Sequence, residues 1–139
     1  MKTKKLIIDC DPGQDDAVML LLAFSAPDAF EILGITTVAG NVSLAKTQRN
    51  ARIVTEISGR RGIKIFAGCD RPLLRQPITA EHVHGHEGID GAPIYEPALP
   101  LQKEHAVDFI ITTLKSAADH SITLVPTGPL TNIALALAR

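Results

Sequence analysis

The alternation of strand-like and helix-like segments is the feature that most constrains the fold of this chain. The apolar run Leu6-Ile7-Ile8 leads directly into acids, which is typical of a strand over 6–10 that is buried on both faces of a parallel sheet. Further strands are predicted at 32–38, 63–66 and 122–125, and helices at 15–24, 43–58, 106–114 and 130–137. This order implies right-handed crossovers and an α/β fold: an open, mostly parallel sheet with helices on both faces.

Local signals set the ends of the first two helices. Asp15 and Asp16 favour the positive end of the first helix, and Pro27 stops it. Ser43 is placed to cap the second helix, and Gly59 follows its last turn. The buried face of the second helix is predicted to hold Ala45, Ala51, Val54 and Ile57.

Length and composition favour one domain with an aliphatic core. A chain of 139 residues buries about two-thirds of its surface on folding, which suffices for one core. Hydrophobic residues make up 45% of the chain but aromatic residues only 4%, so aliphatic side chains must fill that core.

Charge and cysteine usage bear on partners and location. The 14 basic and 15 acidic residues form no long run of either sign, which argues against nucleic acid and anionic membranes as partners. No apolar stretch approaches the ~20 residues that span a bilayer. Cys10 and Cys69 form no CxxC pair and no disulfide framework, so a cytoplasmic location is expected.

Periodicity fails between residues 70 and 100. This stretch holds five of the nine prolines and three of the five histidines, and a loop of that length is typical of a lid or a binding loop. The alternating histidines His82, His84 and His86 could bind a transition metal, but one of them as a hydrogen-bond partner of a substrate is the preferred interpretation.

Polar or small residues follow each predicted strand. In open parallel sheets ligands bind beyond the carboxyl ends of the strands, so these residues are the first candidates for a site. The first strand leads into the acids of 9–16, the second into Gly40 and Asn41, and the fourth into Thr127-Gly128. The third leads into the stretch 70–100, called the histidine loop below. Asn41 and the 127–129 turn could equally be structural turn elements.

The segment 9–16 carries the strongest chemical signal. It holds four carboxylates, Asp9, Asp11, Asp15 and Asp16, whose mutual repulsion in one tight turn is costly unless a cation or protons offset it. Helix capping accounts for two such acids but not for four at the end of a strand. A hard cation held by oxygen, Ca²⁺ or Mg²⁺, is the simpler account. The spacing is not that of an EF-hand, because Leu20 stands where that loop needs its Glu.

These residues resemble the inosine-uridine preferring nucleoside hydrolases. The resemblance is carried by four segments that together extend over essentially the whole chain: 9–17, 39–42, the loop 84–91 and 126–132. It implies a Rossmann-like parallel-sheet fold, a tightly bound Ca²⁺, and hydrolysis of the N-glycosidic bond of purine or pyrimidine ribonucleosides to ribose and free base, in nucleoside catabolism and salvage.

The resemblance also implies roles for individual residues. Asp11 would bind Ca²⁺ and act as the general base for the attacking water, and Asp16 and the main-chain carbonyl of Thr127 would be further calcium ligands. Three residues would contact the nucleoside: Asp15 and Asn41 at the ribose, and His84. We expect the full-length form to be a homo-oligomer that binds a small-molecule ribonucleoside.

Members of this family are roughly twice as long as this chain. We therefore expect residues 1–139 to be the N-terminal portion of a single nucleoside hydrolase-like domain, truncated at the C-terminus, because the last helix lacks a stop signal after Leu137. The further calcium and ribose ligands, the acid for the leaving group and the determinants of base preference would lie outside it.

The sequence is also compatible with two other functions. A strand followed by Asp9-x-Asp11 also resembles the haloacid-dehalogenase-type phosphohydrolases, which use Mg²⁺, with Thr36 or Thr37 at the end of the second strand. That interpretation leaves Asp15 and Asp16 at the start of the helix unexplained. The third possibility is a catalytically silent binding module made from half of the fold.

Overall fold

The computed structural model describes residues 3–139, which form a four-stranded, all-parallel sheet. Its strands are β1 (Lys4–Cys10), β2 (Phe30–Thr37), β3 (Ile65–Ala67) and β4 (Ile122–Pro126). Their order in the sheet is β3-β2-β1-β4. The chain therefore adds strands in one direction from β1 to β3 and then returns to place β4 on the other side of β1. This reversal is the switch point at which open α/β sheets bind their ligands.

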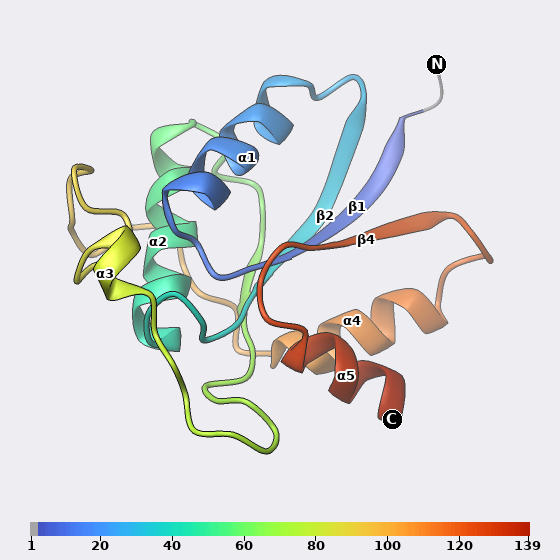
Figure 1. Cartoon of the computed structure of the whole chain (residues 1–139). Helices are drawn as coiled ribbons and strands as arrows, with labels where there is room; N and C mark the ends of the chain where they lie inside the picture. The colour runs from blue at the N-terminus through green and yellow to red at the C-terminus, as the bar shows by residue number, and fades with distance from the viewer. Residues whose placement is uncertain (1–2) are drawn as a thin grey trace.

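Helices cover both faces of the sheet, as predicted (Figure 1). The helices are α1 (Gln14–Ser25), α2 (Leu44–Ile57), α3 (Glu81–His84), α4 (Ala106–Lys115) and α5 (Thr131–Ala138). Figure 1 shows α1 and α2 on one side of the sheet and α4 and α5 on the other. None of the helices in the described part of the chain is long and apolar enough to cross a membrane.

Side chains on the two faces of β1 pack into two separate apolar clusters. Leu6 and Ile8 point to the cluster under α1 and α2, where Leu20 and Phe24 of α1 pack. Ile7 points the other way, to the cluster under α4 and α5. Alternate residues of one strand thus face opposite layers, which is why the run 6–8 had to be apolar throughout.

The predicted elements are confirmed, with local differences. The loop between β3 and α4 contains the four-residue helix α3, which has no periodic signal because it is a single turn. Gly59 follows α2 with a φ of +76°, as its placement predicts, whereas the Ser43 side chain makes no capping hydrogen bond. The predicted face of α2 is wrong at Ala45 and Ile57, which are exposed. Polar Thr47 and Asn50 are buried in their place.

Candidate functional site

The predicted site lies at the carboxyl ends of β1, β2 and β4, and Asp11 is its centre. The main-chain N–H of Asn41 donates to Asp11 Oδ2 at 2.7 Å, and the Asn41 side-chain amide donates to the Asp11 carbonyl at 2.9 Å. The N–H of Asp11 in turn donates to Asp16 Oδ2 at 3.1 Å. The sequence prediction that these three residues come together is therefore confirmed.

Two glycines make room for the Asp11 carboxylate. A Cβ at Gly40 would lie 2.1 Å from Asp11 Oδ2, and a Cβ at Gly128 would lie 2.7 Å from Asp11 Oδ1. Contacts this short do not occur between real atoms, so any side chain at either position would displace the carboxylate or the turn. Asp11 is thus enclosed by backbone from the β2 and β4 exits, and it is only 5% exposed.

Burial dominates the electrostatics of the acidic cluster. It raises the pKa of Asp11 to about 6; the hydrogen bond from Asn41 opposes this shift, and the nearby charges of Asp16 and Asp15 add to it. Burial also raises the pKa of Asp16, against a hydrogen bond from the Thr127 side chain. Two buried acids whose ionised forms are disfavoured in this way are the arrangement that a bound cation would relieve.

Asp9 does not belong to the reactive surface. It is fully buried, and its Oδ1 accepts hydrogen bonds from Thr36 Oγ1 at 2.6 Å and from Asn132 Nδ2 at 2.8 Å. No partner for its Oδ2 lies among residues 3–139. A nucleophile must reach its substrate, so the burial of Asp9 argues against the phosphohydrolase interpretation, which requires Asp9 to attack phosphorus.

The turn after β4 is hydrogen-bonded to Asp9 of β1. The main-chain N–H of Thr127 donates to the Asp9 carbonyl at 2.8 Å, and the N–H of Gly128 approaches the same oxygen at 3.4 Å. Thr127 itself is exposed. The turn at 127–128 therefore abuts Asp11, and the Thr127 carbonyl predicted as a metal ligand belongs to this turn.

His84 and Asp15 lie on the open side of the cluster. His84 Nδ1 is 2.6 Å from Gln14 Oε1, and a Cβ at Gly13 would lie 2.6 Å from the same ring nitrogen. The ring thus packs over the turn that leads from β1 to α1. Asp15 is exposed in the first turn of α1. Both predicted substrate contacts are therefore next to the acidic turn and accessible.

Several residues that sequence analysis missed hold the histidine loop in place. Asn50 is fully buried, and its amide donates to the carbonyls of Pro12 and Glu87 at 3.2 and 2.8 Å. The Glu87 carboxylate binds Arg49, with Lys46 3.6 Å away. The available signal in the sequence is the presence of polar residues along α2 beside the apolar positions of its buried face.

The three loop histidines make different contacts. His84 binds Gln14, His86 lies against Lys46 and Glu87, and His82 is exposed. Among residues 3–139, no three His, Cys, Asp or Glu side chains lie close enough to form a metal site by themselves. The residues predicted to bind a hard cation, Asp11, Asp16 and Thr127 through its carbonyl, all offer oxygen. These three residues supply only part of the six to eight oxygen ligands that Ca²⁺ takes.

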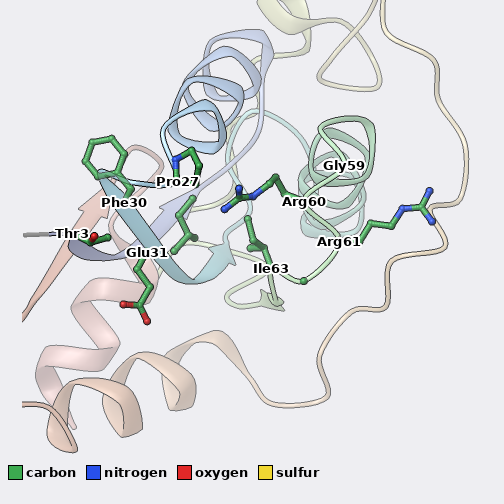
Figure 2. Close-up of a pocket in the computed structure, with 10 residues that line it drawn as sticks. Thr3, Pro27, Phe30, Glu31, Gly59, Arg60, Arg61 and Ile63 are labelled. Carbon is green, nitrogen blue, oxygen red and sulfur yellow. The ribbon is translucent and has the colours of Figure 1, made fainter.

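A separate hollow lies at the opposite end of the sheet, where β1 and β2 begin. It encloses about 670 Å³ and is lined by residues that include Thr3, Glu31 and Arg60. Figure 2 shows that the side chains of Arg60 and Arg61 diverge, so they do not converge on one ligand. The hollow is remote from the acidic cluster and takes no part in the site.

Comparison with known proteins shows the family of this chain. A family model described as inosine-uridine preferring nucleoside hydrolase matches residues 6–139. The chain belongs to this family. It is 51% identical over 135 residues to the inosine-uridine preferring nucleoside hydrolase of Crithidia fasciculata, an alignment that covers 96% of this chain and 42% of that protein. It is 48% identical over 139 residues to the pyrimidine-specific ribonucleoside hydrolase RihB of Escherichia coli, covering 99% and 43%.

Solved structures agree with this assignment. The purine-preferring ribonucleoside hydrolase from Gardnerella vaginalis is 35% identical with a TM-score of 0.89, over 97% of this chain and 43% of that one. An inosine-guanosine nucleoside hydrolase is 34% identical with a TM-score of 0.84, over 97% and 43%. The predicted α/β fold and the resemblance to this family are thereby confirmed. The chain spans about two-fifths of the length of the relatives it matches.

Proposed function

We propose that the whole protein hydrolyses the N-glycosidic bond of ribonucleosides, giving ribose and a free base, with Asp11 as the general base. The single observation that carries this proposal is the Asp11 carboxylate itself, buried between Gly40 and Gly128 at the switch point of the sheet. Family membership supplies the reaction class. The buried acid supplies the chemistry that such a reaction needs.

Calcium is the proposed cofactor, and the residues present fit it in part. Asp11, Asp16 and the Thr127 carbonyl offer oxygen donors only, which suits Ca²⁺ rather than a metal that prefers sulfur or imidazole. Burial raises the pKa of both carboxyls, and the charges of neighbouring acids add to that rise, so a cation at this site would stabilise their ionised forms. When bound, Ca²⁺ would favour ionisation of the attacking water and hold the ribose hydroxyls.

The proposed role of Asp11 is to accept the proton of the attacking water. As the water oxygen bonds to the anomeric carbon, the C–N bond breaks and its electron pair leaves with the base. Burial raises the pKa of this carboxyl to about 6 in the metal-free chain, so it is mostly ionised at neutral pH and can accept a proton. Asn41 keeps it oriented through the hydrogen bond to Oδ2.

Asp15, Asn41 and His84 are the proposed substrate contacts. The exposed Asp15 carboxylate can accept hydrogen bonds from ribose hydroxyls, and Asn41 is bound to the neighbouring Asp11. His84 stands over Gly13 and presents its ring toward the space beside Asn41. The relatives are named for inosine-uridine, pyrimidine, purine and inosine-guanosine substrates. We infer that base preference is decided largely outside this part of the fold.

Ribose release by the whole protein tests the proposal. Asp11→Asn removes the proton acceptor but keeps the shape of the side chain, so turnover of inosine or uridine should fall on the order of 10²–10⁴-fold. Asp119→Asn, at an exposed position in the turn before β4, is the matched control and should leave turnover unchanged. Unchanged turnover in Asp11→Asn would show that Asp11 is not the general base. Calcium binding without turnover in the unaltered protein would instead favour a silent binding module.

A further inference from the structure

We infer that Asn132 is a positioning residue that holds the turn after β4 against the Asp11 carboxylate. This inference rests on the proposed function and names a residue whose side chain lies behind the reactive surface. Asn132 is in the first turn of α5 and is fully buried. Its role follows from where its hydrogen bonds go.

The Asn132 amide joins the exits of all four strands. Its Nδ2 donates to Asp9 Oδ1 at 2.8 Å, at the end of β1, and to the Thr37 carbonyl at 3.1 Å, at the end of β2. Its Oδ1 accepts the N–H of Cys69 at 2.8 Å, just after β3. Asn132 itself follows β4 by six residues. One side chain therefore holds together the points at which the chain leaves the four strands.

The 127–132 turn is consequently bound at both ends to Asp9. At one end the Thr127 N–H donates to the Asp9 carbonyl, and at the other Asn132 donates to the Asp9 carboxylate. Gly128 lies between these two attachments, and its α-carbon is so close to Asp11 that a Cβ would lie 2.7 Å from Oδ1. Loss of either attachment would let the turn move away from Asp11.

The surroundings of Asn132 are shaped for this amide. A Cβ at Gly68 would lie 2.2 Å from Asn132 Oδ1 and 2.5 Å from Nδ2, so only glycine leaves the space that the amide occupies. Thr36 completes the arrangement by donating to the same Asp9 oxygen at 2.6 Å. A leucine of similar size would fill the volume but would leave the N–H of Cys69 and the Asp9 carboxylate each without this partner.

Two variants test the inference in the whole protein. Asn132→Asp keeps the shape but loses both donated hydrogen bonds and brings a second carboxylate to Asp9. Gly68→Ala keeps the asparagine at position 132, but the added methyl group would displace its amide. Groups that orient metal ligands from behind change metal affinity or activity by about 10–100-fold, and we expect losses of this size in Ca²⁺ affinity and in kcat for both variants.

Amide hydrogen exchange over residues 127–132 supplies a readout that does not depend on activity. Both variants should raise exchange at Thr127 at least about fivefold, which corresponds to the loss of one hydrogen bond. Gly62→Ala, in open space, and Thr55→Val, which removes a buried hydroxyl bound to Ala51 in α2, are the controls and should change neither exchange nor calcium affinity.

Each outcome decides the inference. Wild-type exchange at 127–132 together with wild-type calcium affinity in Gly68→Ala would overturn it, and this variant decides the matter if Asn132→Asp does not fold. Loss of thermal stability without a change in these two quantities would show a structural role only, and would also overturn it. Absence of nucleoside hydrolysis in the unaltered protein would refute the proposed function, while the exchange measurement would still decide whether Asn132 positions the turn.

Discussion

Gly40→Ala is the perturbation that most sharply separates a shaped catalytic pocket from an ordinary surface turn. The added methyl group would lie 2.1 Å from Asp11 Oδ2 and 2.8 Å from Pro129 Cγ. A carbon and an oxygen in contact prefer about 3.5 Å, so the overlap exceeds 1 Å and the carboxylate must move. Displacement of a reacting group by about 1 Å can cost on the order of 100-fold in rate.

The expected result is therefore a large kinetic effect with a smaller effect on stability. Turnover of inosine or uridine should fall about 100-fold, while the free energy of unfolding should fall by about 1–3 kcal/mol, as for other overpacked sites. Ribose release and chemical denaturation of the same preparations measure the two quantities. Gly62→Ala is the control, because a Cβ there meets nothing within 4 Å. Wild-type turnover in Gly40→Ala would refute the claim that Asp11 needs its present position.

Three further predictions concern electrostatics and packing. Folding raises the pKa of Asp11 from 3.8 to about 6, so in calcium chelator its contribution to stability is present below pH 3.8 and lost as the pH rises through 6. Asp11→Asn should then lose less stability than wild type between pH 4 and 7, and equal losses would contradict this. Glu87→Gln breaks the ion pair that binds the loop of His82, His84 and His86 to Arg49, so KM should rise several-fold. Glu104→Gln, at an exposed position, is the control and should leave KM unchanged. Equal KM values in the two variants would contradict a role of this loop in substrate binding. Phe109→Ala removes a ring stacked 3.8 Å from Phe66 and should cost about 3–5 kcal/mol by chemical denaturation without changing calcium affinity; a loss below about 1 kcal/mol would be inconsistent with that packing.

The fold could be predicted from sequence because its strands are buried on both faces. A strand such as β1 must be apolar at consecutive positions, and the acids that follow it mark its carboxyl end. The helix α3 gave no such signal, since four residues cannot show a period. Strand order also had no local signal. It depends on which side of β1 the chain returns to, and only the structure places β4 there.

The candidate site was predictable where its residues follow strands and not where they support it. Asp11 and Asn41 lie in the loops that follow β1 and β2, and Asp16 lies in the first turn of α1, so topology alone brings them together. Asn50 and Asn132 lie inside helices and bind main-chain atoms distant in sequence. Their partners become neighbours only after the chain has folded, so a local pattern cannot reveal them.

The most direct test of the account is ribose release from inosine and uridine by the whole protein after calcium removal and re-addition. Burial disfavours the ionised forms of Asp11 and Asp16, and a bound cation would offset that cost, so chelation should abolish turnover and added Ca²⁺ should restore it. Turnover that is unaffected by thorough chelation, or the absence of ribose release with Ca²⁺ bound, would contradict the account.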